Sequence, residues 1–279
     1  MTGPARTAAR RAYLKLLAGR TRELKPDDLG GPAIVFAPHP DDETLGCGGT
    51  VITMVEGGVD VSVVFMTDGR KSHRALMDEE ELAGLRKGEG LEACSRLGVA
   101  PGKVHFLGIH NGKLGEERAR ALPSVLKIIG AEAPRQVFIP YGGEPPVGST
   151  DHWETSSIVR EALGGASSRA TVLEYPVWYW RHWPMVSSPH PGLYRASRFS
   201  AKSALWAARL LRDFNCRSAT AAVEARKRYA LEAHRTQMSR YLPDSDWQTL
   251  SDVSSGQFLE CFFLGFEVFR CHPSGSLPA

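Results

Sequence analysis

Short β-branched runs alternate with longer stretches of helical period through the first two thirds of the chain. This alternation is typical of repeated βαβ units, which bury a largely parallel sheet between helices. Because parallel strands need crossover helices, the sequence predicts an α/β fold, a three-layer sandwich with a mostly parallel, Rossmann-like sheet. The expected strands span Ala33–Ala37, Val59–Thr67, Val104–Leu107, Gln136–Pro140 and Thr171–Val177. The expected helices lie near Thr44–Glu56, Asp78–Leu97, Glu116–Ile129 and Glu154–Leu163.

The last third of the chain departs from this pattern. A long polar helix is expected around Ala219–Tyr241, and the aromatic density of Phe258–Phe269 favours a late strand pair or an edge addition to the sheet. Ser187–Ser200 is rich in Ser, Pro and Gly and is expected to form a loop.

The N-terminal segment is basic, with leucines at positions that indicate an amphipathic helix. Such a helix can pack on the domain through its leucine stripe or lie on a membrane surface, and the sequence leaves both open. We interpret residues 1–30 as a basic N-terminal extension and residues 31–279 as a single α/β domain that includes the C-terminal helix and strand addition. The basic residues are Arg6, Arg10, Arg11, Lys15, Arg20, Arg22 and Lys25.

Composition narrows the classes of function. The 34 Lys and Arg residues nearly balance the 31 Asp and Glu residues, and the net charge of +3 gives no reason to expect a nucleic-acid partner. The five cysteines form no C-x-x-C pair, which favours a reduced, cytoplasmic chain. No apolar run reaches the roughly 18 to 20 residues of a membrane-spanning helix, and the N-terminus lacks the apolar stretch of a signal peptide.

Ionisable side chains follow the first expected strand directly, in His39-Pro40-Asp41-Asp42-Glu43. Open α/β sheets build their sites at the carboxyl ends of such strands. His39 and Asp42 can supply a nitrogen and an oxygen to one metal ion, while Asp41 stays free. Taken alone, the motif is equally well a turn in which an aspartate caps the next helix. Glu43 can support the ligands or simply occupy the first helical turn.

A third ligand must come from another strand end, and His152 meets that need. It lies beyond the fourth expected strand and before a helix, so it should reach the same edge of the sheet. Two histidines, one aspartate and open coordination positions are typical of a catalytic zinc site, because structural zinc sites usually have four protein ligands. We therefore expect one zinc ion per chain.

The motif A-P-H-P-D-D-E-T-L-G-C-G-G at residues 37–49 resembles the signature of the LmbE/PIG-L deacetylases. Met66-Thr67-Asp68-Gly69, Arg86-x-x-Glu89, Asp151-His152 and the late H-x-T-Q element at residues 234–237 follow in the order found in that family. The resemblance covers roughly residues 32–240. The glycines of the first motif also suggest a dinucleotide loop, but close helix–sheet packing explains them better because the preceding carboxylates would repel a pyrophosphate.

The resemblance implies that His39, Asp42 and His152 bind zinc and that Asp41 is the general base. It also implies removal of an acetyl group from an N-acetylglucosamine-type conjugate. An unactivated amide needs an activated water, a polarised carbonyl and a protonated leaving amine, which one zinc with an adjacent carboxylate can provide. The alternatives are an amidase that cleaves a larger acyl or thiol conjugate and a non-catalytic metal- or carbohydrate-binding relative.

Two positions differ from the family pattern. Many relatives have H-P-D-H before the helix, with the first histidine placed to stabilise the oxyanion, whereas this chain has Ser149 there. We expect Ser149 and Asp151 to take part in catalysis. Asp151 would lack its usual imidazole partner unless a distant histidine replaces it, the candidates being His182, His190 and His234. Asn111 stands where sugar-binding relatives often have aspartate.

Several further side chains are expected to contact an amino-sugar substrate. Arg86 is favoured by the family match, whereas Arg70 can equally be a solvated arginine. Trp178 lies in an aromatic run whose faces suit the apolar faces of sugars, and packing in the core or between subunits explains that run as well, which leaves a homo-oligomer open. The expected substrate-binding residues are Arg86, Asn111, Arg70, Trp178 and His234.

Overall fold

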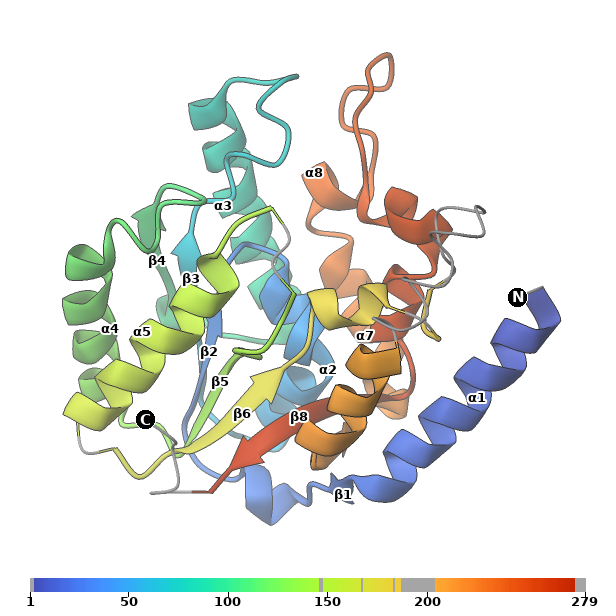
Figure 1. The fold of residues 1–279 in the computed structure, drawn as a ribbon. Coiled ribbons are helices and arrows are strands. Elements are labelled where there is room, and N and C mark those ends of the chain that lie inside the picture. The colour runs from blue at the N-terminus through green and yellow to red at the C-terminus, as the bar shows by residue number, and fades with distance from the viewer. Residues whose placement is uncertain (1–2, 146–147, 167, 183, 187–203, 274–279) are drawn as a thin grey trace.

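The computed structural model describes residues 3–145, 148–166, 168–182, 184–186 and 204–273. Over these residues the chain forms an eight-stranded sheet of order β1-β7-β8-β6-β5-β2-β3-β4 (Figure 1). Every neighbouring pair is parallel except the two that β8 makes with β6 and β7. The strands are β1 (Arg22–Glu23), β2 (Ala33–Ala37), β3 (Val61–Thr67), β4 (Val104–Ile109), β5 (Gln136–Pro140), β6 (Thr171–Tyr175), β7 (Cys216–Ala219) and β8 (Phe266–His272).

Helices cover both faces of the sheet. They are α1 (Gly3–Arg20), α2 (Asp42–Glu56), α3 (Glu79–Leu97), α4 (Arg118–Glu132), α5 (Asp151–Gly165), α7 (Glu224–Leu231) and α8 (Arg235–Met238). Residues 204–213 are also helical. Short 3₁₀ segments span Pro26–Leu29, Pro101–Lys103, Trp178–Arg181, Ala221–Val223, Leu250–Gly256 and Leu259–Phe262.

Two hydrophobic clusters fill the space between the layers, because successive strand residues point to opposite faces. Val35 and Phe65 belong to the cluster under α2, α3 and α7, whereas Ile34 and Val64 belong to the cluster under α4 and α5. Gly46 permits close approach of α2 to the sheet, since a Cβ there would lie 2.2 Å from the ring of Tyr175. The predicted three-layer α/β fold and the packing role of the glycine run are confirmed.

The C-terminal third contains two corrections to the sequence prediction. Ala219–Tyr241 is not one helix: β7 ends at Ala219, and α7 and α8 are separated by a break at residues 232–234. The break follows from tertiary contacts, because the backbone N–H of Thr236 donates to Glu89 Oε1 at 2.9 Å and cannot continue the helical pattern. Ser187–Ser200, expected as a loop, lies outside the described residues.

The second correction concerns Phe258–Phe269, which forms neither a strand pair nor an edge addition. A 3₁₀ turn comes first, and the single strand β8 then lies inside the sheet, antiparallel to β6 on one side and β7 on the other. Phe269 is fully buried. An interior position satisfies the backbone hydrogen bonds of β8 on both sides, which an edge position would not.

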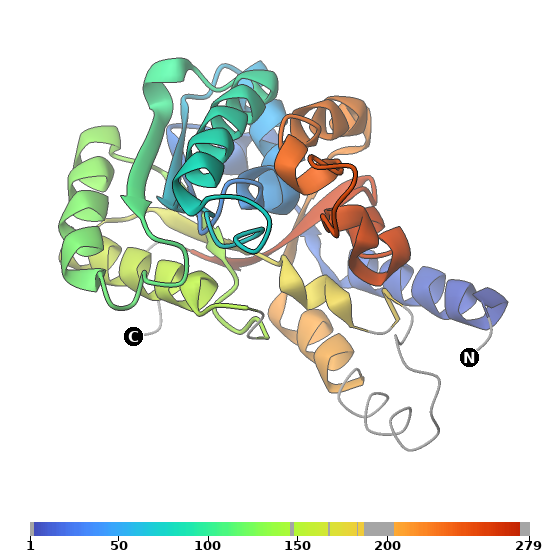
Figure 2. The same ribbon diagram turned by 90° about the horizontal axis from the view of Figure 1, so that it is seen from above.

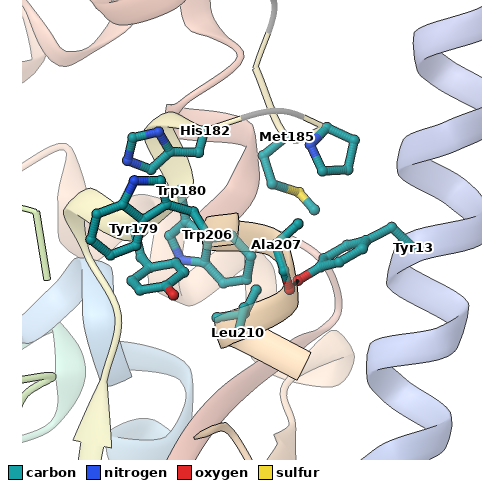
Figure 3. Close-up of a pocket in the computed structure, with 9 residues that line it drawn as sticks. Tyr13, Tyr179, Trp180, His182, Met185, Trp206, Ala207 and Leu210 are labelled. Atoms are coloured by element: carbon teal, nitrogen blue, oxygen red, sulfur yellow. Dashed lines mark hydrogen bonds between the residues drawn. The ribbon is translucent and has the colours of Figure 1, made fainter. Parts of the chain in front are cut away.

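The N-terminal segment packs against the rest of the fold. β1 pairs in parallel with β7, and α1 lies at the opposite end of the molecule from α4 and α5 (Figure 2). Leu17 is fully buried in the core, whereas Leu16 is 50% exposed. Tyr13 Oη donates to the carbonyl of Ala207 at 2.9 Å (Figure 3). The aromatic pocket there holds only about 10 Å³, which fits one water at most.

Among the described residues, no helix has the length and apolar character that crossing a membrane requires.

Candidate metal centre

The candidate residues gather where two neighbouring strands send their helices to opposite faces. β2 and β5 are adjacent, the helix after β2 is α2, and the helix after β5 is α5 on the other face. Such a switch point opens a crevice at the carboxyl ends of the strands. His39 follows β2, Asp42 is the first residue of α2, and His152 lies in the first turn of α5. The chain topology therefore brings the three expected ligands to one place.

Asp42 lies between the two histidines. Its Oδ2 is 3.2 Å from His39 Nδ1 and 3.3 Å from His152 Nε2, and the three ligand atoms lie within 4.8 Å of one another. Two ligands that are each about 2.0–2.1 Å from a tetrahedral zinc would be about 3.3 Å apart. The cluster is thus compatible with a metal ion in the described part of the chain, and its mixed nitrogen and oxygen donors suit zinc better than magnesium or calcium.

Each histidine has a carboxylate on its other ring nitrogen. His39 Nε2 lies 3.2 Å from Asp151 Oδ2, and His152 Nδ1 lies 2.8 Å from Glu144 Oε2. Carboxylates in this position fix the ring orientation and leave the opposite nitrogen as the donor to a metal. Glu144 is almost fully buried and also accepts a hydrogen bond from the backbone N–H of Val177.

The two histidines also explain why Asp42 stays ionised in this buried site. Burial favours its neutral acid, but His152 and His39 outweigh that effect and hold the pKa of Asp42 well below its ordinary value. For His152, burial favours the neutral ring, yet Asp42 and Glu144 raise its pKa well above the ordinary value. The site is therefore built around a carboxylate that stays ionised, as a metal ligand must.

Asp151 does have an imidazole partner, but it is His39 rather than any of the three distant histidines considered from the sequence. The Oδ2 atom of Asp151 also accepts from Asn111 Nδ2 at 2.8 Å and from the backbone N–H of Gly112 at 2.6 Å. Burial opposes ionisation of Asp151, but these contacts and His39 lower its pKa to about 2. The backbone N–H of Asp151 lies 3.4 Å from Ser149 Oγ.

Asp41 occupies an unusual backbone conformation beside the ligands. Its φ of 134° lies in a region that favours glycine, and its backbone N–H donates to Glu43 Oε2 at 2.9 Å. Arg86 Nη2 lies 3.1 Å from Asp41 Oδ2, and Arg86 also donates to the carbonyls of Pro40 and Gly69. Burial raises the pKa of Asp41 to about 6, and Arg86 limits the rise. Asp41 can therefore accept a proton near neutral pH.

His234 and Glu43 form a buried pair, and Glu43 is the residue that accepts a hydrogen bond from the backbone N–H of Asp41. His234 Nε2 lies 2.8 Å from Glu43 Oε1, and both side chains are completely buried. Thr44 Oγ1 donates to the same Glu43 oxygen at 2.5 Å. Substrate contact was expected of His234, but in this structure it faces Glu43 and does not line the cavity.

A cavity of about 700 Å³ opens onto the metal centre. The expected residues Asp41, Arg86, Asn111, Ser149 and Trp178 line it together with His39 and Asp42. The ring of Trp178 stacks on Phe258, with centroids 5.2 Å apart, and forms an apolar wall with it. Arg70 does not line the cavity, because Asp68 at 2.6 Å and Glu80 hold its guanidinium elsewhere.

The sequence does not predict the positions of Glu144, Lys71 and Arg74 in this region. Glu144 follows β5 by four residues, and Lys71 follows β3 by the same interval. Their positions after strand ends were the available signal, since loops at that edge of the sheet line the site.

The sequence matches a known family over part of its length. Residues 34–163 match the family described as PIG-L, GlcNAc-PI de-N-acetylase. The chain is 31% identical over 134 residues to diacetylchitobiose deacetylase of Thermococcus kodakarensis, covering 48% of this chain and 49% of that protein. It is 32% identical over 154 residues to the 1D-myo-inositol 2-acetamido-2-deoxy-alpha-D-glucopyranoside deacetylase of Actinosynnema mirum, covering 46% and 53%. The chain thus spans about half the length of these curated relatives.

Solved structures share the fold over most of the chain. N,N'-diacetylchitobiose deacetylase from Pyrococcus horikoshii aligns with a TM-score of 0.62 at 21% identity, covering 87% of this chain and 84% of that one. GalB, the 4-carboxy-2-hydroxymuconate hydratase of Pseudomonas putida KT2440, aligns with a TM-score of 0.52 at 14% identity, covering 90% and 98%. Because a deacetylase and a hydratase share this architecture, the fold by itself does not specify the reaction.

Proposed function

We propose that this chain, a member of the LmbE/PIG-L family by the match of residues 34–163, is a zinc-dependent hydrolase that removes the acetyl group from an N-acetylglucosamine-type conjugate. The observation that carries the proposal is the cluster of His39, Asp42 and His152, with the proton acceptor Asp41 beside it, at the end of a cavity large enough for a sugar conjugate. The curated relatives named as deacetylases support the reaction type.

His39, Asp42 and His152 would hold the metal. A bound zinc ion acts as a Lewis acid on a carbonyl oxygen and lowers the pKa of a bound water from about 15.7 to about 7. Asp151 and Glu144 keep the two imidazole rings in the orientation that binding requires. One zinc ion per chain is the proposed cofactor.

Asp41 is the proposed general base. Arg86 keeps its carboxylate ionised despite burial, and both residues line the cavity. Asp41 would take a proton from the attacking water and return it to the leaving amine, so that the amide nitrogen departs as a neutral amine. Ser149 is proposed to donate a hydrogen bond near the substrate carbonyl, and Trp178 to face the sugar ring.

The substrate test is acetate release from a panel of N-acetylated amino-sugars, with zinc present and after chelation. We expect release that requires about one zinc per chain, established by metal analysis of the purified protein. Full activity in a metal-free preparation would refute the metal mechanism. Faster release of a longer acyl group than of acetate would favour the amidase alternative, and zinc binding without any release would favour a non-catalytic relative.

We also propose a cytoplasmic location, supported by five cysteines that are all free thiols. Contact of α1 with a membrane surface remains a proposal that rests on the five basic and no acidic side chains of that helix. A homo-oligomer likewise stays a proposal, which size-exclusion chromatography with light scattering would test.

A further inference from the structure

Two cations line the cavity without a role in the chemistry proposed above. Lys71 and Arg74 lie in the loop between β3 and α3 and line the same cavity as the aromatic residues Trp178 and Phe258. A Cβ on Gly112 would lie 2.8 Å from Lys71 Nζ, so the ammonium group packs directly over that backbone. The N–H of Gly112 donates in turn to Asp151, the carboxylate that lies beside His39. Lys71 therefore lies close to the metal centre.

Neither cation has an acidic partner within the described residues. The neighbouring Arg70 is paired with Asp68 and Glu80, and Arg86 is paired with Asp41, but neither Lys71 nor Arg74 takes part in an ion pair. Of the three basic residues in this loop, Arg70 is therefore bound by acidic side chains of the protein, whereas Lys71 and Arg74 are available to a ligand in the cavity.

The charge balance of the cavity favours an anion. Its lining carboxylates are Asp41 and Asp42, of which the first faces Arg86 and the second lies between two histidines. Neither of these carboxylates neutralises Lys71 or Arg74. A concave surface with uncompensated charge of one sign concentrates ligands of the opposite sign.

We infer that Lys71 and Arg74 bind an anionic group, a carboxylate or a phosphate, on the aglycone of the amino-sugar conjugate. This inference rests on the proposed deacetylation and names its substrate class. With the acetamido group at the metal centre and the sugar beside Trp178, the aglycone would occupy the rest of the same cavity, which Lys71 and Arg74 also line. A lysine and an arginine suit carboxylate and phosphate oxygens through charge-assisted hydrogen bonds.

The first experiment compares three zinc-loaded reactions that differ only in the aglycone. The substrates are methyl N-acetyl-α-glucosaminide, N-acetylglucosamine 1-phosphate and N-acetylglucosaminyl malate. We expect kcat/KM to be at least about tenfold higher for one or both anionic substrates, mainly through a lower KM, and the advantage to shrink at high salt. Equal kcat/KM for all three overturns the inference but leaves deacetylation intact.

The second experiment uses Lys71→Met, Arg74→Gln and the control Lys127→Met, which removes the same charge from an exposed position on α4. We expect each cavity variant to lose about tenfold in kcat/KM for the preferred anionic substrate and less than twofold for the methyl glycoside. The control should match the wild type throughout. Equal loss of kcat on all substrates by Lys71→Met would place Lys71 at the reacting carbonyl and overturn its assignment to the aglycone.

Binding measurements keep the two proposals separable. If the wild type deacetylates none of the three substrates, the proposed function fails, and calorimetric titration of the same zinc-loaded protein then tests the cation pair. Tighter binding of the anionic glycosides, lost in Arg74→Gln, supports the inference without turnover. Equal binding of neutral and anionic glycosides overturns it. Arg74 is exposed, so its variant remains informative if Lys71→Met does not fold.

Discussion

Glu144→Gln tests whether a buried carboxylate sets the metal affinity of this site. Glu144 is 2% exposed, and its Oε2 lies 2.8 Å from His152 Nδ1. Glutamine has nearly the same shape and can place its side-chain oxygen beside the same ring nitrogen, so the substitution removes the charge with little change in packing. Loss of an outer carboxylate typically lowers metal affinity by about 10- to 100-fold, which is about 1.4–2.8 kcal/mol.

We expect the loss of zinc affinity to lie at the lower end of that range for Glu144→Gln and at the upper end for Glu144→Ala. Alanine removes the acceptor of the Val177 backbone N–H as well as the partner of His152, and both groups are buried. An unsatisfied buried donor costs about 1–3 kcal/mol by itself. We therefore expect Glu144→Ala to lose thermal stability in addition to zinc affinity, whereas Glu144→Gln should lose mainly zinc affinity.

Competition with a chromophoric chelator measures zinc affinity directly. The matched control is Glu154→Gln, which removes the same charge from a residue of α5 that pairs with Arg118 at 3.4 Å and does not line the cavity. At saturating zinc, Glu144→Gln should recover much of the wild-type turnover, because the three ligands remain. Zinc affinity of Glu144→Gln within twofold of both wild type and control would refute the orienting role of Glu144.

Four further predictions follow from the site and its support. Asp41→Asn should keep its zinc and lose roughly 10²–10⁴ in turnover, whereas Asp42→Asn should lose zinc affinity; the reverse pattern in metal analysis would exchange their roles. Arg86→Gln removes the cation that limits the pKa of Asp41, so Asp41 should stay protonated to a higher pH. The acidic limb of the pH profile of kcat/KM should therefore shift to higher pH, and an unchanged limb contradicts this. Ser149→Ala should slow turnover by less than about tenfold, and a loss of a hundredfold would make its hydroxyl essential. Lys227→Met should lower the free energy of unfolding by about 3–5 kcal/mol in denaturant titration, because it leaves the buried carboxylate of Glu267, 2.7 Å from Lys227 Nζ, without its charge partner. A loss below about 1 kcal/mol would contradict that.

The parallel core of the fold could be predicted from the sequence because its signals are local. β2 and β5 have the predicted bounds, since continuous buried runs such as Ala33–Ala37 are read directly from hydrophobicity. The same logic brought His39, Asp42 and His152 together, because parallel strands place their carboxyl ends at one edge of the sheet.

Other features depend on partners that no local pattern specifies. Glu144 lies in a Gly- and Pro-rich segment eight residues before His152, and its proximity to that ring arises only after α5 packs on the sheet. The insertion of β8 between β6 and β7 is also invisible locally, because an interior antiparallel strand and an edge strand have similar composition. Arg70 and Lys71 are adjacent in sequence, yet only Lys71 reaches the cavity, because acidic residues hold the arginine elsewhere.

The conformation of Asp41 links the fold to the reaction. A non-glycine residue at φ 134° is unfavourable, and such positions persist only where neighbouring contacts determine them. Here Glu43 accepts the hydrogen bond of the Asp41 backbone, and Arg86 holds the side chain. This backbone conformation lets two consecutive carboxylates diverge: Asp42 turns to the histidines, while Asp41, the proposed proton acceptor, lines the cavity. Since the same architecture also occurs in a hydratase, the proposed amide hydrolysis depends on this local divergence at the end of β2 rather than on the sheet itself.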